Sequence, residues 1–392
     1  MTPEMREYLD APHDRIGTNC EKWDGLERLY GRSDLIALWV ADMDFRTVPQ
    51  VREALVRRAK HAIYGYTDDG ERARAAEAGW LKRRHGLDVD PDWILYSPGV
   101  VDSLYFCVGA LTGPGDGIVV QPPVYGPFYN AVRLYDRALV RSPLIREDGE
   151  WRMDFDDLEA KFAAGAKMMI LCSPHNPVGR VWTRAELQRL VDLVNRYGVA
   201  LVSDEIHADF ALDGRKQTRI LALDGAERAV MLTSATKSFN LAGLRQSSII
   251  VKDAAIRKTL KNAVERVHAA SPNIFGGIAQ TTAYQYGDEW MDAVVEYVTE
   301  NRDFAVEFIR REIPEILCRP QEGTYLMWMD FRGLGMNQAD AIAMLVNRAH
   351  VALNDGLFFG EEGRGWFRMN LATQRDNVAR GLENIRDAIR SR

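Results

Sequence analysis

The chain has 392 residues, of which 46% are hydrophobic, and its 50 basic and 56 acidic side chains give a formal net charge of -6. Such a chain can bury a large core and is long enough for a large domain and a smaller one. The acidic balance, without a basic run, argues against a nucleic-acid partner, and no apolar stretch of about 18 residues occurs that would cross a membrane. The charged N-terminus lacks an apolar targeting segment, so we expect a cytoplasmic protein.

The four cysteines are Cys20, Cys107, Cys172 and Cys318. They are widely separated, whereas zinc sites use closely spaced pairs and secreted scaffolds concentrate many cysteines in a short chain. We therefore expect reduced thiols that mostly fill the core, and no metal site.

Seven short apolar runs predict the strands of one buried sheet. They lack the polar alternation of half-exposed strands, which is typical of a parallel sheet with helices on both faces. Helical patterns lie between several of them; in the segment 184–198 the apolar stripe ends at Gly198. The pattern predicts an α/β domain whose seven mostly parallel strands cover 93–96, 117–120, 138–141, 168–172, 200–203, 230–233 and 248–251.

The pattern changes after Gly287, where a long helix over 290–313 is followed by a strand candidate at 324–331 and by further helices. This mixture is typical of a smaller α+β domain. We therefore expect a large domain over 46–286 and a small domain built from 1–45 and 287–392.

Polar turns after the predicted strands are the places where open α/β sheets hold ligand-binding groups. The first turn, Ser97-Pro-Gly-Val100-Val101, opens a helical pattern, so its main-chain amides would face an anion near a helix N-terminus. The second turn holds Tyr125 after two prolines, and its ring could stack on a cofactor ring or simply pack.

The third and fourth turns carry an amide and a carboxylate. Asn176, between two prolines, could donate to a ring oxygen, although Asn-Pro alone is a common turn signal. Asp204 ends an apolar run. An aspartate that faces a pyridine nitrogen would keep that nitrogen protonated. The alternative is that Asp204 only caps the N-terminus of the next helix. His207 follows three residues later and could donate to the phenolic oxygen of the same ring.

The fifth turn places Lys237 just beyond a buried strand. A lysine in that position can lose its hydration and form a Schiff base, although an isolated lysine is more often a surface residue. Ser234 and Arg245 flank it and could bind a dianionic phosphate, the arginine through its planar fork of donors.

In order and spacing, these turns resemble the fold-type I pyridoxal-phosphate enzymes of the aminotransferase class I/II superfamily. The chain looks most like its cystathionine β-lyase subgroup called MalY/PatB, through the motifs KWD (22–24), WVADMDF (39–45), SPGVV (97–101), PPVYGPF (122–128), SPHNPVGRVW (173–182), SDEIHADF (203–210), TKSFNLAGL (236–244) and EGTYLMWMDF (322–331).

The resemblance implies a cofactor, pyridoxal 5'-phosphate, joined to Lys237 as a Schiff base. It implies that Asp204 pairs with the ring nitrogen and that Tyr125 stacks on the ring. Asn176 and His207 would contact the ring oxygen. The residues implied at the phosphate are Val100, Val101, Ser234, Arg245 and, from the second subunit of a homodimer with shared sites, Tyr66.

The same resemblance implies that Arg368 clamps the α-carboxylate of an amino-acid substrate, with Ala41 and Asn176 as further substrate contacts. Its fork of donors matches a carboxylate. Four positions depart from the subgroup's usual pattern, namely Cys20, Thr236, Arg245 and Asp355. The departures concern the substrate more than the cofactor.

The resemblance implies β-elimination from an S-substituted L-cysteine, giving a thiol, pyruvate and ammonia. Lys237, once free, would act as the general base at the substrate Cα. Alternatives are a transaminase, or an enzyme of specialised metabolism that acts on a bulky cysteine S-conjugate. Two further readings are the Ser234-x-x-Lys237 pattern of serine acyl-enzymes, whose companion motifs are absent, and a non-catalytic regulator built on the fold.

Overall fold

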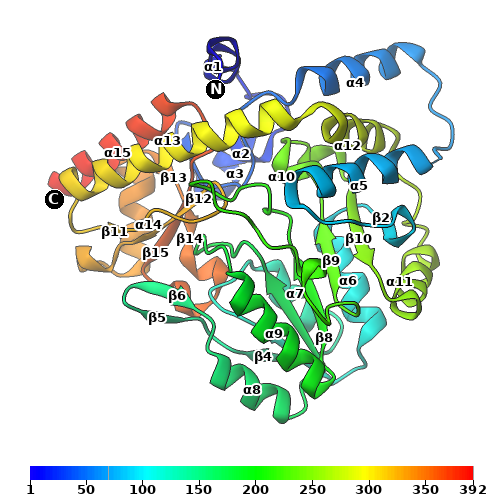
Figure 1. Cartoon of the computed structure of the whole chain (residues 1–392). Coiled ribbons are helices and arrows are strands. Elements are labelled where there is room, and N and C mark those ends of the chain that lie inside the picture. The colour runs from blue at the N-terminus through cyan, green and yellow to red at the C-terminus, as the bar shows by residue number, and fades with distance from the viewer. Residues whose placement is uncertain (69, 392) are drawn as a thin grey trace.

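The computed structural model describes residues 1–68 and 70–391. Its central feature is a seven-stranded sheet in the order β2-β10-β9-β8-β7-β3-β4 (Figure 1). Strand β10 is antiparallel to both of its neighbours and the other pairs are parallel. The strands are β2 (Ile94–Ser97), β3 (Gly117–Val120), β4 (Ala138–Arg141), β7 (Met168–Cys172), β8 (Ala200–Asp204), β9 (Val230–Thr233) and β10 (Ser247–Val251). The predicted α/β fold is confirmed, and each predicted strand is present within one residue of its expected ends.

Helices cover both faces of this sheet, which explains why its strands are apolar without alternation. In β7, Met169 and Leu171 pack into one core while Met168 and Ile170 pack into the other. The first core is closed mainly by α5 (Glu71–His85), α8 (Phe155–Ala163) and α9 (Arg184–Tyr197), and the second by α6 (Val100–Leu111), α7 (Pro127–Arg133) and α11 (Ala254–Arg266).

Helix α9 follows the sequence pattern closely. Thr183 and Glu186 form a reciprocal capping box at its start, and the helix ends at Gly198 in the left-handed conformation with φ 66°. Its predicted apolar stripe is buried. Local sequence signals therefore fix both ends and the buried face of this helix.

A second, four-stranded antiparallel sheet has the order β11-β12-β15-β14. Its strands are β11 (Leu317–Cys318), β12 (Leu326–Asp330), β14 (Asn354–Asp355) and β15 (Trp366–Asn370), and the helices beside it are α13 (Asp288–Glu312), α14 (Gln338–Asn347) and α15 (Arg375–Arg390). The long helix and the strand predicted after Gly287 are thus confirmed. The division into a large domain over 46–286 and a small domain of 1–45 and 287–392 remains a proposal. It is supported because all strands of the seven-stranded sheet lie in the first range and all strands of the four-stranded sheet lie in 287–392.

The N-terminal segment joins this smaller part through β1 (Ile36–Ala37), which pairs in parallel with β13 (Val351–Ala352). The remaining elements are α1 (Pro3–Asp10), α2 (Glu21–Asp24), α3 (Leu26–Tyr30), α4 (Pro49–His61), the hairpin β5 (Ile145–Glu147) with β6 (Glu150–Arg152), α10 (Ala235–Ser238) and α12 (Ile274–Tyr286). Short 3-10 turns complete the described chain, namely η1 (Pro91–Trp93), η2 (Ile220–Ala222), η3 (Ala242–Leu244), η4 (Arg332–Leu334), η5 (Gly356–Phe359) and η6 (Glu361–Gly363).

The two faces of the smaller sheet have different roles. Met327, Met329 and Phe367 belong to the core beneath the C-terminal helices. Trp328, which pairs in register with Arg368, belongs instead to the core of the large sheet. Because paired residues point to the same face of a sheet, Arg368 is directed toward the large sheet.

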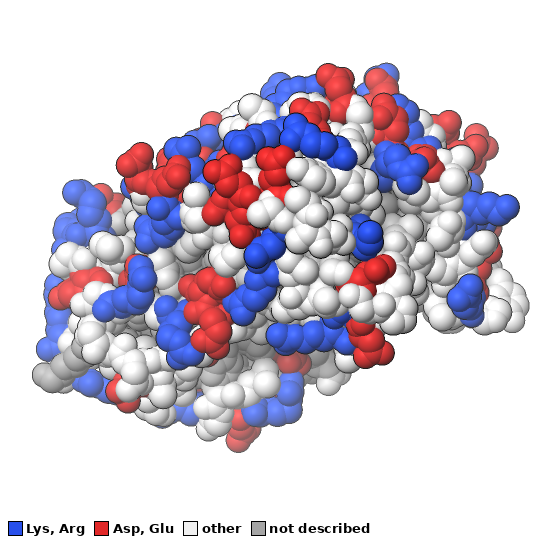
Figure 2. All heavy atoms as spheres, turned by 90° about the horizontal axis from the view of Figure 1, so that it is seen from below, with Lys and Arg blue, Asp and Glu red and all other residues white. Residues whose placement is uncertain are grey.

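The surface carries mixed charge. Acidic and basic side chains are interspersed over the face shown in Figure 2. No helix described within residues 1–68 and 70–391 combines the length and the apolar character that crossing a membrane requires.

The loops beside the smaller sheet are closely packed where η5 meets η6. A Cβ placed on Gly363 would overlap the carbonyl of Gly356. We expect Gly363→Ala to lower the free energy of unfolding by about 3 kcal/mol, because backbone rather than a side chain must move. Thermal unfolding followed by circular dichroism measures this. Gly277→Ala is the matched control, since its Cβ would meet only Pro272 at 4.0 Å, and an equal loss there would refute the packing explanation.

Candidate active site

The candidate site lies where the two sheets meet, at the carboxyl ends of β7, β8 and β9. Asn176 follows β7, Asp204 ends β8 and Lys237 follows β9, while Arg368 comes from β15 of the smaller sheet. Arg368 donates to Asn176 Oδ1 at 3.0 Å, which joins the two parts directly. Residues far apart in the sequence therefore form one buried cluster of charged and polar groups.

Lys237 is held by main chain from the N-terminal segment. Its Nζ donates to the carbonyl oxygen of Ala41. Burial lowers the pKa of Lys237 to about 8; Asp42 and Asp204 oppose this shift, whereas Arg368 adds to it. The lysine is therefore easier to convert to a nucleophilic amine than a surface lysine.

Asp204 is a buried carboxyl group at the end of β8. Its Oδ1 accepts a hydrogen bond from the main-chain N–H of Ile206 at 3.1 Å. Asp204 therefore caps the turn that follows β8, not the N-terminus of a helix. Burial raises the pKa of Asp204 to about 7, although Lys237 opposes the shift. A cationic N–H brought to this carboxylate would lower that pKa and satisfy the buried charge.

Arg368 is the positive group of the site. Besides Asn176, its guanidinium donates to the carbonyl oxygen of Trp39 at 3.0 Å and lies 4.9 Å from the ring centre of Phe359. Burial lowers the pKa of Arg368 to about 10, and its Nε has no partner among the described residues. No carboxylate in the described part of the chain forms an ion pair with Arg368. Its guanidinium can therefore pair with the carboxylate of a substrate.

Two aromatic residues complete the predicted ring site. His207 is buried, and burial, followed by the charges of Lys237 and Arg368, holds its pKa well below the usual range. Its Nδ1 has no partner among the described residues. The ring of Tyr125 lies 5.8 Å from that of Phe358, and burial raises the pKa of its hydroxyl.

The predicted phosphate residues lie at the start of α6. Val100 and Val101 begin this helix, and Gly99 at its N-cap provides no side chain, so the first main-chain amides remain available to an anion. Ser234 contacts the Gln246 carbonyl at 2.6 Å and not Lys237, which does not favour the acyl-enzyme reading.

Arg245 lies over the start of α6, whereas Tyr66 lies on the exposed surface. Arg245 adopts a left-handed conformation with φ 47° and pairs with Asp102 at 3.0 Å, which places its exposed guanidinium over the first turn of α6. Tyr66 is fully exposed, so this chain alone does not bring it to Lys237.

Comparisons with known proteins show strong similarity over nearly the whole chain. Residues 33–385 match the family aminotransferase class I and II. The chain belongs to this family. It is 38% identical to the cystathionine beta-lyase PatB of Bacillus subtilis over 384 residues, which cover 97% of this chain and 99% of PatB. It is 32% identical to the protein MalY of Escherichia coli, over 96% of this chain and 97% of MalY.

Solved structures of relatives agree with this assignment. Cystalysin from Treponema denticola, whose crystal contains pyridoxal 5'-phosphate, matches with a TM-score of 0.94 and 32% identity over 98% of both chains. The PLP-bound C-S lyase from Staphylococcus hominis matches with a TM-score of 0.90 and 31% identity over 97% of both chains. The resemblance predicted from the motifs, to MalY- and PatB-type members of the family, is confirmed.

Two contacts of this family member explain residues of the motifs to which no role had been given. Tyr325 donates to the Ala41 carbonyl at 3.1 Å, beside Lys237. Lys22, the lysine of KWD, is fully buried and pairs with Asp44 at 2.6 Å. Lys22 thus joins the motifs KWD and WVADMDF, and it also donates to the carbonyl of Asp42, the residue after Ala41, at 3.0 Å.

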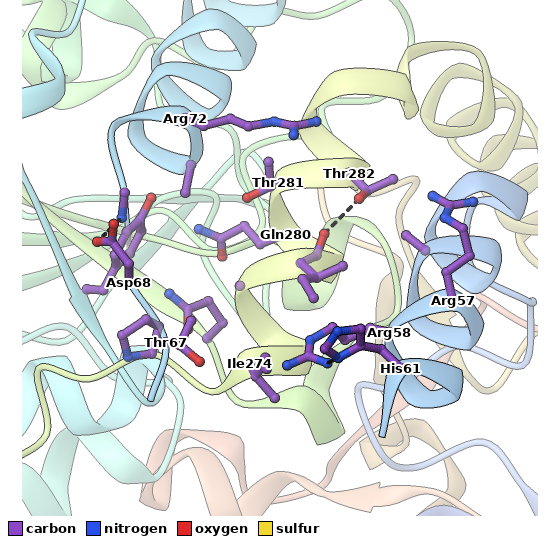
Figure 3. Close-up of a pocket in the computed structure, with 18 residues that line it drawn as sticks. Arg57, Arg58, His61, Thr67, Asp68, Arg72, Ile274, Gln280, Thr281 and Thr282 are labelled. Carbon is purple, nitrogen blue, oxygen red and sulfur yellow. Dashed lines mark hydrogen bonds between the residues drawn. The ribbon is translucent and has the colours of Figure 1, made fainter. Parts of the chain in front are cut away.

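A separate cavity of about 590 Å³ lies between α4, α12 and the segment before α5. Figure 3 shows its arginines Arg57 and Arg58 on α4 and the polar side chains Gln280 and Thr281 on α12. Lys237 is not among its lining residues, so this cavity is distinct from the candidate active site.

The neighbours of Lys237 predict how its pKa responds to substitution. Asp42→Asn should lower the pKa of Lys237 below about 8, because a carboxylate that favours the ammonium is lost, and Arg368→Gln should raise it. Titration of the isotopically methylated lysine by NMR in cofactor-free protein measures both shifts. A pKa that moves in neither variant would contradict the proposed electrostatic contacts.

Proposed function

We propose that this protein is a pyridoxal-phosphate-dependent carbon–sulfur lyase that acts on an S-substituted L-cysteine and releases a thiol, pyruvate and ammonia. The observation that carries this proposal is the 38% identity with PatB over almost the full length of both chains. Its more distant relative, an aspartate aminotransferase from Pyrococcus horikoshii, is 22% identical. The difference favours elimination over transamination.

The residues present fit pyridoxal 5'-phosphate. Asp204 offers a buried carboxylate for a ring N–H, and His207 Nδ1 is buried without a partner among the described residues. We assign ring contacts to these two residues and to Asn176 and Tyr125. We assign the phosphate to the start of α6 and nearby donors, namely Val100, Val101, Ser234 and Arg245. When bound, the group supplies an aldehyde for Lys237 and an electron sink for the substrate Cα.

Lys237 and Arg368 divide the work on the substrate. Arg368 binds the α-carboxylate through its fork of donors and fixes the substrate's orientation, with Asn176 beside it. Lys237, once released as an amine, takes the proton from Cα as general base. Its pKa of about 8 leaves part of the population neutral near pH 7, and the Ala41 carbonyl holds its Nζ in place.

We further propose a homodimer with shared sites, located in the cytoplasm. The segment after α4 exposes Ile63, Tyr64 and Tyr66, three large apolar or aromatic side chains close together in the chain. Such a patch is unfavourable in water and fits a surface covered by a second copy. Tyr66 would then reach the phosphate of its neighbour. The four free cysteines are compatible with a reducing compartment.

The lyase proposal predicts the products. Purified protein with its cofactor should convert L-cystathionine, or another cysteine S-conjugate, to equal amounts of thiol and pyruvate. Lys237→Ala should lower this rate by at least about 1,000-fold, because base and cofactor attachment are both lost. A coupled assay for pyruvate and a thiol reagent measure the two products. A sulfur-containing oxo acid without free thiol would instead establish a transaminase.

The role of Arg368 predicts a change in KM. Arg368→Gln should raise KM for the amino-acid substrate by about 10- to 100-fold, since a charge-assisted pair with the carboxylate is lost. Steady-state kinetics measure the change. Arg364→Gln, at an exposed arginine paired with Glu361, is the matched control. Equal KM values in wild type and Arg368→Gln would remove Arg368 from the substrate site.

Shared sites predict that two inactive variants restore activity when mixed. In a mixed dimer of Tyr66→Ala and Lys237→Ala, one site combines an intact Lys237 with an intact Tyr66. Activity should therefore return after the two are unfolded and refolded together, but not when they are refolded separately. Failure to recover activity in dimers shown to be mixed would place Tyr66 outside the site.

A further inference from the structure

A second cavity, of about 610 Å³, lies at the junction of the two sheets but on a surface other than that of the candidate active site. It is bounded by the hairpin β5–β6, the chain after β11 and the turn at 178–180. Its size is within the range of small-molecule sites, about 300–1,000 Å³. Neither Lys237 nor Arg368 lines it.

Gln321 is the most unusual residue in this cavity. Its side chain is only 5% exposed, and neither its Nε2 nor its Oε1 has a partner among the described residues. The main chain of Gln321 is fixed, because Arg302 donates to its carbonyl at 3.1 Å. The Cβ of Gln321 also packs so closely on Gly179 that a side chain at position 179 would not fit. The side-chain amide of Gln321 offers one N–H donor group and one carbonyl acceptor. A second amide can satisfy both, because its carbonyl accepts from Nε2 and its N–H donates to Oε1.

Three acidic side chains line the cavity, namely Glu150, Asp213 and Glu322, and each is paired with an arginine. Three donors on its wall have no such acidic partner. Trp328, also 5% exposed, has an Nε1 without a partner among the described residues. Arg146 and Arg319 both reach the β5–β6 turn, where they donate to main-chain carbonyls of Gly149 at 3.3 Å and Asp148 at 2.7 Å. Neither arginine forms an ion pair with a described acidic side chain, so together they favour a carboxylate.

Indole rings form the apolar part of the wall. Trp151 and Trp366 lie 5.7 Å apart, and the guanidinium of Arg146 is 5.3 Å from the ring centre of Trp366. Trp366 is stacked on Trp328 and contacted by Arg146 and Arg332. An apolar side chain of the ligand therefore rests on the half-buried Trp151 while its carboxylate meets Arg146.

We propose that this cavity binds an N-acylated amino acid with an apolar side chain. Gln321 pairs with the ligand's amide, Arg146 and Arg319 hold its carboxylate, and the indole of Trp151 covers its side chain. A free amino acid offers an ammonium in place of that amide and leaves Gln321 Nε2 without an acceptor carbonyl. The proposal does not depend on the reaction catalysed at Lys237.

The cavity has a structural connection to the candidate active site. The ring of Trp328 lies 5.4 Å from that of Phe359, and Phe359 lies under the Arg368 guanidinium. The two sites are thus neighbours with separate linings.

Isothermal titration of the cofactor-loaded protein with N-acetyl-L-leucine tests the proposal. This probe cannot form a Schiff base, because its nitrogen is acylated, so the visible absorbance of the cofactor reports any entry into the active site separately. We expect saturable binding without a change in that absorbance. The analogue 4-methylpentanoate, which keeps the carboxylate but lacks the amide, should bind at least about tenfold more weakly.

Two substitutions and a control complete the experiment. Gln321→Leu and Arg319→Ala should each weaken binding of N-acetyl-L-leucine by about tenfold, whereas Arg228→Ala, at an exposed arginine outside the cavity, should not. Arg319 is exposed, so its substitution leaves the core intact even if Gln321→Leu fails to fold. The proposal is overturned if wild type shows no saturable binding, if 4-methylpentanoate binds equally well, or if Arg319→Ala binds like wild type.

Discussion

The site depends on the burial of charged groups that lack partners of opposite charge in direct contact. Where the two sheets meet, burial draws the pKa of Asp204 up to about 7 and the pKa values of Lys237 and Arg368 down to about 8 and 10. Such burial costs stability, and the apolar cores on both sides of the sheet offset that cost. These groups fit the roles proposed for them, in which a cofactor brings a ring N–H and an aldehyde, and a substrate brings a carboxylate.

The N-terminal segment makes this arrangement rigid. Asn370 on β15 donates to the carbonyls of Val40 and Asp42, each at 2.7 Å, while the buried pair of Lys22 and Asp44 holds the same segment from the other side. The Ala41 carbonyl between these contacts faces Lys237. The smaller sheet, the N-terminal segment and the large sheet therefore position the lysine together, so a shift between the two sheets would change its surroundings.

Local patterns were sufficient for much of this structure. Strand positions follow from apolar runs, the ends of α9 follow from Thr183 and Gly198, and the turns with Asn176 and Asp204 follow from their place after strands. Contacts between distant segments could not be read in this way. Three features arise only when distant segments of the chain pack together. They are the hydrogen bond from Tyr325 to Ala41, the ion pair of Arg245 with Asp102, and the two side-chain amide atoms of Gln321 without a partner among the described residues. The place of Tyr66 depends on a second copy, which one chain cannot specify.

We infer that the buried charges are adapted to pyridoxal 5'-phosphate, and substitution of Asp204 gives the sharpest test of this adaptation. The measurement is the thermal midpoint of wild type and Asp204→Asn, each with and without the cofactor. Without cofactor, Asp204→Asn should be at least as stable as wild type, because it removes a buried carboxylate that lacks an ion pair. With cofactor, wild type should gain clearly more than Asp204→Asn, since a ligand stabilises the folded state more when it binds more tightly. Equal gains in the two proteins would show that Asp204 is not adapted to the cofactor.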